Sequence, residues 1–169
     1  MTKVLLALAA VLVIGGAGLY AWSSRCPCDR TPGFVLMGPV SETPVEEWSF
    51  INDVPLCQVQ VWGMWGPISV NLTCMATPEG HLFLSCSTGA QKYWCNQVGA
   101  NERARLRAEG TVYPVLLTRE QDPSALDRAW AARVKKLKAH NPSGAPVPAD
   151  GTQRPDSWWS FRARSTPAA

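Results

Sequence analysis

Two pairs of short segments, each pair joined by a turn that contains glycine, most constrain what this chain can fold into. In the first segment, polar side chains alternate with apolar ones, the pattern of a strand with one buried face. Each turn combines residue types that favour chain reversal, so each pair is predicted to form a β-hairpin. Hairpins pair antiparallel, which favours a sheet of antiparallel strands. The segments are residues 68–76, 81–85, 104–108 and 111–118, and the turns are residues 77–80 and 109–110.

Further elements complete the prediction. Residues 57–62 alternate like a strand, Asp122-Pro123 supplies an N-cap and a first-turn proline for a helix ending near residue 139, and residues 157–164 place two tryptophans on opposite faces of a last strand. A brief strand at residues 34–37 and a helix at residues 90–98 are also expected. The predicted fold is mainly β (α+β): a small antiparallel split β-barrel with two flanking helices, preceded by one transmembrane helix.

The N-terminal stretch is long enough to cross a membrane. Residues 4–22 carry no charge, Lys3 precedes them, and Tyr20 and Trp22 are of the type that gathers at bilayer interfaces. A cleaved signal peptide is the alternative, but Leu19-Tyr-Ala21 is a poor cleavage site. We therefore expect a single-pass, uncleaved anchor in the inner (cytoplasmic) membrane, with the domain on the periplasmic, extracytoplasmic side.

The rest of the chain divides by composition. Residues 1–25 form the anchor, residues 26–45 a tether rich in proline and glycine, residues 46–164 one barrel domain, and residues 165–169 a disordered tail. The formal net charge is only +3, which does not favour nucleic acid as a partner. Lys135, Lys136 and Lys138 are expected to be solvated near a helix end.

The chain has six cysteines, all beyond the anchor, which is compatible with disulfides in an oxidising compartment. Sequence does not choose among the pairings. Cys26 and Cys28 are expected to be bridged elsewhere or free, in preference to forming a redox or metal-binding pair, and Cys74 and Cys86 to be small buried side chains. The two histidines lie far apart, so no metal site is predicted. Haem is not favoured without a Cys-x-x-Cys-His motif, although His81 is available as an axial ligand.

The segment from Ser85 to Trp94 is the candidate for chemistry. A turn containing Ser87 and Thr88 is predicted between a strand and a helix, where backbone N–H groups, the helix dipole and Lys92 would together hold a phosphate. An ordinary polar turn is the alternative interpretation.

The order of these elements resembles the flavin-binding split β-barrel superfamily, which includes pyridoxamine 5′-phosphate oxidases and deazaflavin-dependent nitroreductases. The match is nearest to an uncharacterised bacterial branch and spans residues 32–138. It is carried by the Pro-Gly-x-x-Leu-x-Gly entry, Trp-Ser-Phe, Ser-Val-Asn and Gly-x-Val-Tyr motifs, which here are residues 32–38, 48–50, 69–71 and 110–113.

The resemblance implies a homodimer that binds FMN, or deazaflavin, at the interface between its chains. By position, Ser87, Thr88 and Lys92 would hold the phosphate, Ser69 and Asn71 would face the ring, and a tryptophan such as Trp94 or Trp62 would wall the pocket. Thr73 lies on the same strand face, and the alternative for that face is plain exposure to solvent.

The chain departs from the family at the phosphate turn. The family usually has two adjacent basic residues there and another on the adjoining strand, whereas here Gln91 precedes Lys92 and residues 68–76 carry no basic residue. Two functions are therefore compared. One is a membrane-anchored flavin oxidoreductase acting on an unknown small molecule, and the other is a cofactor-free binding or assembly module at the membrane surface. Thiol chemistry at Cys26-Pro-Cys28 is less favoured, because no helix N-terminus lowers a thiol pKa there.

Overall fold

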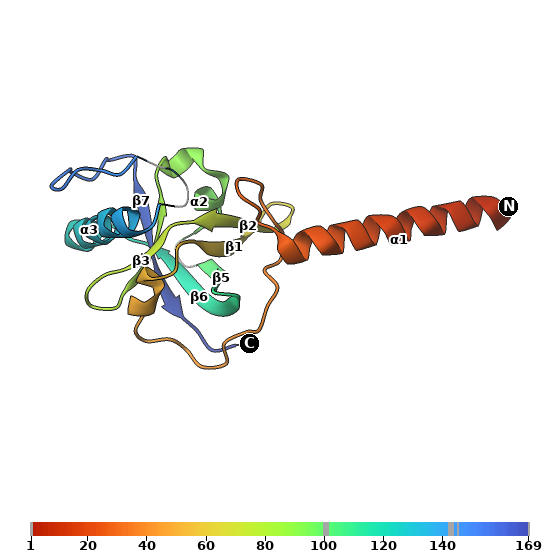
Figure 1. Cartoon of the computed structure of the whole chain (residues 1–169), viewed down its shortest axis with the longest axis horizontal. Helices are drawn as coiled ribbons and strands as arrows, with labels where there is room; N and C mark the ends of the chain where they lie inside the picture. Colours follow the sequence, from red (N-terminus) through yellow and green to blue (C-terminus); the bar gives the residue numbers. More distant parts are fainter. Residues whose placement is uncertain (1, 100–101, 142–143, 145, 169) are drawn as a thin grey trace.

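The computed structural model describes residues 2–99, 102–141, 144 and 146–168. One antiparallel sheet of seven strands, in the order β2-β1-β5-β6-β7-β4-β3, forms the body of the molecule (Figure 1). The strands are β1 (Cys57–Gly63), β2 (Gly66–Leu72), β3 (Cys74–Ala76), β4 (Leu82–Cys86), β5 (Glu102–Ala108), β6 (Thr111–Arg119) and β7 (Trp159–Ser165). The helices are α1 (Thr2–Arg25), α2 (Tyr93–Gln97) and α3 (Pro123–Ala139), with single 3-10 turns η1 (Ser49–Asn52) and η2 (Gly89–Gln91).

The connection between β2 and β3 explains why the sheet curls. These strands lie at opposite edges of the sheet, yet only Thr73 separates them in the chain. The two edges must therefore come together, and the sheet rolls into a half-barrel. The predicted fold class, a mainly β antiparallel barrel with flanking helices behind an apolar N-terminal helix, is confirmed. The predicted hairpin of β5 with β6 forms as expected. The other forms only in part, because the predicted strand 68–76 is split: residues 74–76 (β3) pair with β4, whereas residues 68–72 belong to β2 and pair with β1.

Alternation along the strands fills the inside of the half-barrel. On β1, every second side chain is fully buried, because strand side chains point to opposite faces in turn. The same rule brings apolar residues of β5, β6 and β7 into one cluster. Its central members are Val59, Leu106, Leu117 and Phe161.

A second, smaller core lies between α3 and the outer face of the sheet. Met75, Phe83 and Trp158 pack there against Ala125 and Ala129 of α3. Trp159 packs instead against the barrel core, so the two tryptophans do lie on opposite faces. The helix begins as predicted, with the Asp122 side chain accepting a hydrogen bond from the Ala125 N–H at 2.9 Å.

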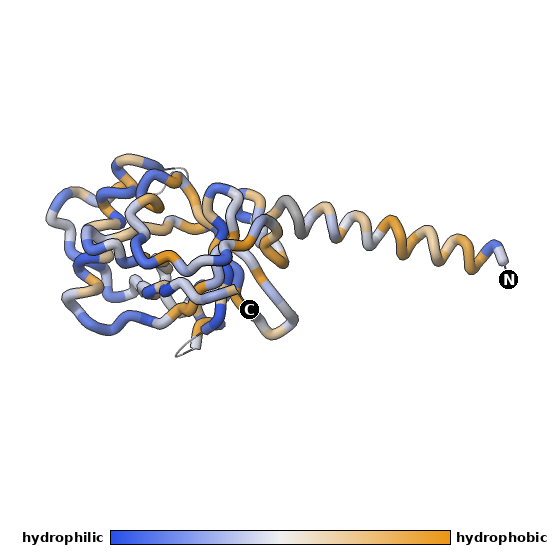
Figure 2. Tube along the Cα trace, turned by 90° about the horizontal axis from the view of Figure 1, so that it is seen from below, coloured by the Kyte–Doolittle hydropathy of each residue, from blue (hydrophilic) through white to orange (hydrophobic). Residues whose placement is uncertain are grey.

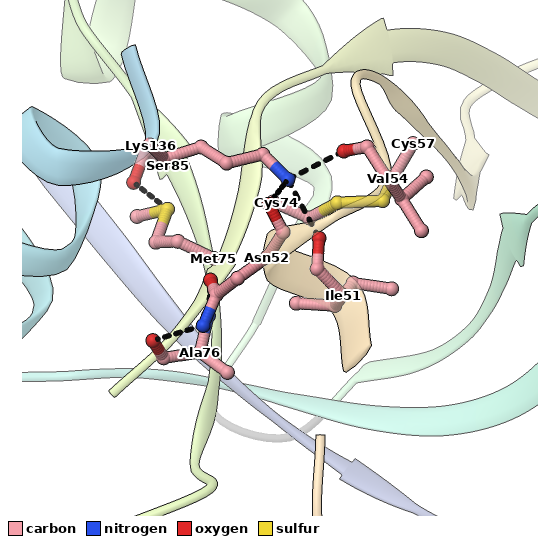
Figure 3. Close-up of a disulfide and its surroundings, with 9 residues drawn as sticks. All are labelled: Ile51, Asn52, Val54, Cys57, Cys74, Met75, Ala76, Ser85 and Lys136. Atoms are coloured by element: carbon pink, nitrogen blue, oxygen red, sulfur yellow. Dashed lines mark hydrogen bonds between the residues drawn. A yellow bond between two sulfur atoms is a disulfide. The ribbon is translucent and has the colours of Figure 1, made fainter. Parts of the chain in front are cut away.

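Three further local expectations are wrong. The predicted helix at residues 90–98 is instead the 3-10 turn η2 followed by the five-residue helix α2, and Lys92 between them has an extended backbone. Residues 34–37 form no strand. Lys136, expected in solvent, is 2% exposed. Its ammonium donates to the carbonyls of Ile51 (2.6 Å), Asn52 (2.9 Å) and Val54, at and just after η1 (Figure 3).

Residues 26–41, expected as a tether, cross the outer face of the sheet. Gly33 exchanges two backbone hydrogen bonds of 2.9 Å with Ser69 on β2, and the Leu36 N–H donates to Gln60 Oε1 on β1 at 2.8 Å. Farther along, the Val112 N–H on β6 donates a hydrogen bond to the Pro39 carbonyl at 2.8 Å. The segment is irregular, but hydrogen bonds fasten it to three strands, β2, β1 and β6.

The helix α1 extends away from the half-barrel (Figure 1) and is apolar along most of its length (Figure 2). Residues Thr2–Trp22 are long and apolar enough to cross a membrane, a test that a signal sequence also passes.

All six cysteines are paired, as Cys26–Cys28, Cys57–Cys74 and Cys86–Cys95. The expectation that Cys26 and Cys28 would not bond to each other is wrong. Cys74 and Cys86 are fully buried as expected, but they are covalently bridged to β1 and α2.

Candidate functional site

A cavity of about 710 Å³ opens where β2, β4, α2 and α3 meet. Its volume lies within the range of ligand pockets in proteins. Asn71, Ser87, Lys92 and Trp94, four of the six residues predicted from sequence, line it. The other lining residues are Asp29, Arg30, Thr31, Pro32, Leu56, Val70, Leu72, Thr73, Ser85 and Arg133.

Lys92 and Arg133 line this cavity without acidic partners of their own. Within the described residues, neither forms a salt bridge, and the lining also contains one carboxylate, Asp29, and a third cation, Arg30. Loss of hydration lowers the pKa of the Lys92 ammonium, and the charge of Arg133 lowers it further. Burial also lowers the pKa of Arg133, which lies over the Trp158 ring at 5.9 Å from its centroid. An anion placed between these cations would relieve both effects.

Arg133 is a second basic residue at this cavity that the sequence analysis did not include. It comes from α3, about forty residues after Lys92, and reaches the cavity because α3 packs on the outer face of the sheet. No spacing rule relates residues on separate elements, so no signal in the sequence could have paired the two.

The loop that carries Ser87 and Lys92 takes its shape from Gly89. This glycine has φ of +44°, in the left-handed region that side chains disfavour. A Cβ there would lie 2.7 Å from both the Ser157 carbonyl oxygen and Trp159 Nε1. Beyond the loop, Trp94 is 6% exposed and packs on Phe161 with a ring-centroid distance of 5.4 Å. Trp94 therefore joins the barrel core and gives only an edge to the cavity.

The three disulfides flank the cavity lining. Cys28 precedes Asp29, and both cysteines of the barrel disulfide, Cys57 and Cys74, directly follow lining residues. The third disulfide, Cys86–Cys95, closes the loop between β4 and α2 that contains Ser87 and Lys92. Cross-links at these positions hold the walls in place before any ligand arrives, which reduces the entropy lost on binding.

The remaining predicted residues lie elsewhere. Ser69 is fully buried and does not line the cavity, and its hydroxyl has no hydrogen-bond partner in the described part of the chain. Thr88 is exposed and also lies outside the lining. Trp62, the other tryptophan considered for the pocket wall, is 60% exposed on the β1–β2 hairpin.

Asn71 lines the cavity, but its amide binds the tether. Its Nδ2 donates to the carbonyls of Pro27 (3.3 Å) and Asp29 (2.8 Å), and its Oδ1 accepts from Gln58 at 3.0 Å. Arg107, on β5, binds the same segment by donating a hydrogen bond to the Met37 carbonyl at 2.8 Å. The polar strand face that was expected to contact a flavin ring or solvent therefore holds residues 26–41.

Two other hollows lie along α3, and the cations in each are accompanied by two carboxylates, Asp127 and Asp150 in the first and Asp53 and Glu79 in the second. In the first, Lys138 pairs with Asp150, and Arg154 lies 3.5 Å from the Asp127 carboxylate. In the second, the Lys136 ammonium is bound by backbone carbonyls. Within the described residues no group of histidine, cysteine and acidic side chains could hold a metal ion.

Comparison with known proteins gives two solved structures of low similarity. One is a NimC/NimA family protein from Clostridium acetobutylicum, with a TM-score of 0.45, 11% identity, and coverage of 69% of this chain and 75% of that one. The other is an FAD and heme binding protein from Mycobacterium smegmatis, with a TM-score of 0.42, 10% identity, and coverage of 72% and 69%. At these values the likeness carries no information about a ligand of this chain. No family model and no curated protein matches it.

Proposed function

We propose that this protein is a membrane-anchored FMN-binding oxidoreductase that holds the cofactor phosphate between Lys92 and Arg133. The observation that supports the proposal is that Lys92 and Arg133 line one preformed cavity, and neither has a carboxylate partner in the described part of the chain. Ser87, exposed beside them, would add a hydroxyl donor. A charge-assisted hydrogen bond contributes about 1.5–3 kcal/mol. Two cations can therefore hold a phosphate without the missing basic residues of the family pattern.

The lining suits the rest of such a ligand only in part. Leu56, Val70 and Leu72 give apolar surface, and Trp94 adds an aromatic edge. FMN, when bound, supplies hydride or electron transfer, and the chain contributes binding and orientation. A deazaflavin that carries a phosphate would satisfy the same cations and is the alternative cofactor.

A comparison of FMN with riboflavin tests the phosphate assignment directly, since riboflavin has the same ring and no phosphate. We expect the full-length protein in detergent to quench the fluorescence of FMN on binding. We also expect it to bind FMN at least tenfold more tightly than riboflavin. Lys92→Ala and Arg133→Ala should each lower FMN affinity by about 10–100-fold, as expected for loss of one charge-assisted bond, and leave riboflavin affinity unchanged. Lys135→Ala, an exposed lysine on the same helix as Arg133, is the matched control.

Equal affinity for FMN and riboflavin would refute the phosphate site. Absence of binding by folded protein to FMN and to a phosphorylated deazaflavin would favour the second candidate, a cofactor-free binding or assembly module at the membrane surface. One observation favours that candidate: the polar strand face that would meet a ring is occupied by residues 26–41.

The anchored, extracytoplasmic location and the homodimer also belong to the proposal. Disulfides on every cysteine favour an oxidising compartment outside the cytoplasm. Protease digestion of intact spheroplasts should remove the domain while leaving α1 with the membrane, and sedimentation in detergent should give twice the monomer mass. Protection of the domain, or a monomer mass, would contradict the respective statement.

A further inference from the structure

The tip of the β1–β2 hairpin, residues 62–65, presents large apolar side chains to the outside. Trp62 is 60% exposed, Met64 78% and Trp65 94%, whereas Trp48 and Trp158 in the domain are 2% and 3% exposed. Apolar surface left in water forgoes about 25 cal/mol for every Å² that could be buried. A cluster of three such side chains on one tight turn indicates a binding surface.

In the view of Figure 1 the β1–β2 turn lies on the same side of the half-barrel as the end of α1. Trp22, at the end of the apolar span, packs edge-on against Phe34 with ring centroids 5.1 Å apart. The neighbouring Gly33 is paired with Ser69 on β2 through two backbone hydrogen bonds. Ser69 is three residues from Gly66 at the hairpin turn, a span of about 10 Å along a strand. The tether is thus fastened to the same strand that leads to the exposed tip.

Contacts with Tyr93 on α2 fix the orientation of the hairpin turn. The Met64 N–H donates to the Tyr93 hydroxyl at 3.0 Å, and the Tyr93 hydroxyl would lie 2.7 Å from a Cβ placed on Gly63. Tyr93 therefore fills the space behind the turn and leaves the side chains at the tip facing outward.

We propose that the hairpin tip inserts into the interfacial layer of the same bilayer that α1 crosses. Tryptophan is enriched at that layer, where an amphipathic ring lies between headgroups and acyl chains. Residues 54–78, which contain the whole hairpin, include no aspartate, glutamate, lysine or arginine, so insertion desolvates no charged side chain. The inference rests on α1 spanning the membrane and is independent of flavin binding. Contact at both α1 and the hairpin would hold the domain in one orientation on the bilayer.

Bromine-labelled lipids test this contact, because bromine on the acyl chains quenches only tryptophans that reach the bilayer. The full-length protein is reconstituted in phosphatidylcholine vesicles with and without bromine at acyl positions 6 and 7. We expect Trp62→Phe/Trp65→Phe to lose about two thirds of the quenchable emission, since Trp22 is the third tryptophan expected near the interface. Trp22→Phe should lose the remaining third, and Trp48→Phe, in the domain core, should lose none. Phenylalanine keeps the apolar side chain, so the domain remains anchored in each variant.

Unchanged quenching in Trp62→Phe/Trp65→Phe would overturn the proposal, whatever Trp22→Phe shows. Acrylamide, a water-soluble quencher, distinguishes a tip covered by protein from a tip exposed to water. If Trp65 is shielded from acrylamide but not quenched by bromolipid, a second copy or another protein covers the tip, and this too overturns it. If acrylamide quenches Trp65 and bromolipid does not, the tip is exposed to water, and the proposal is likewise overturned. FMN titration of the same samples reports the proposed function separately.

Discussion

Replacing Lys136 with methionine should destabilise the domain, although methionine is apolar and is found in protein interiors far more often than lysine. The lysine is 2% exposed, and its ammonium binds three carbonyls at and just after η1 (Figure 3). Methionine is likewise unbranched and one heavy atom shorter than lysine, and it donates no hydrogen bond. The carbonyls of Ile51, Asn52 and Val54 would then lose their shared donor beneath α3.

The expected loss follows from two opposing contributions. Three hydrogen bonds from a charged donor contribute about 5–9 kcal/mol. Burial of the ammonium opposes this by lowering the pKa of Lys136 to about 8, although the charge of Asp53 partly counteracts the shift. A displacement from 10.5 to about 8 corresponds to at most about 3 kcal/mol. The variant should therefore be less stable by about 2–6 kcal/mol at pH 7, a large part of the stability of a typical domain.

The same lowered pKa gives the pH dependence its sign. Between pH 8 and 10.5 the unfolded chain keeps the proton of Lys136 while the folded chain releases it. The unfolded state then binds more protons, so the free energy of unfolding of the parent rises with pH across this window. Lys136→Met lacks this titration, and its deficit relative to the parent should grow by up to about 2 kcal/mol from pH 7 to pH 10, after allowance for solvent screening.

Urea unfolding followed by circular dichroism, with full-length protein in detergent and the disulfides intact, measures both quantities. Lys135→Met, an exposed neighbour on α3, is the control and should change stability little. A Lys136→Met variant as stable as the parent at pH 7 would show that the three hydrogen bonds contribute nothing net. A deficit that shrinks between pH 7 and pH 10 would contradict the direction of the proton linkage.

Three further predictions concern the barrel and its disulfides. Phe161→Ala should lower the free energy of unfolding by about 3–5 kcal/mol, because the ring is fully buried against Trp94; a loss below about 1 kcal/mol in urea unfolding would contradict this packing. Gly89→Ala should cost about 1–3 kcal/mol through its positive φ and close contacts and should weaken FMN binding as the Lys92 loop shifts; unchanged unfolding and titration curves would show that the loop adapts. The Cys26–Cys28 disulfide should be reduced at lower dithiothreitol concentration than Cys57–Cys74 and Cys86–Cys95, because Cys28 is exposed and its bridge closes a very short loop, whereas the other four cysteines are fully buried. Mass spectrometry of alkylated peptides would show the order, and simultaneous reduction would contradict it.

Much of the strand framework could be predicted because its signals are local. The alternation of Cys57, Val59 and Val61 places every second side chain in the core, and the glycine turns close the two hairpins. The Asp122-Pro123 start of α3 is equally local, since the cap and its N–H partner are three residues apart. The helix expected at residues 90–98 failed for a related reason. Cys86–Cys95 and the packing around Gly89 bend that segment, and local propensity does not include either constraint.

The candidate site shows where local reasoning stops. Ser87, Lys92 and Trp94 were predicted from one loop, and all three line the same cavity. Arg133, which also lines it, was not predicted, and Ser69 was expected to face a ring although its backbone pairs with the tether. Both outcomes depend on which distant segment lies against a given face of the sheet.

The sequence by itself determined the apolar N-terminal helix, the hairpins, the start of α3 and the uncharged, tryptophan-rich turn of residues 62–65. Each of these features depends only on residues that are close together in the chain. Tertiary structure alone decided the partners across long distances. It paired the cysteines, brought Arg133 to Lys92 and buried Lys136 over η1. The physical reason is that burial and electrostatic fields are set by every element packed around a side chain, whereas periodicity reports only the element that carries it.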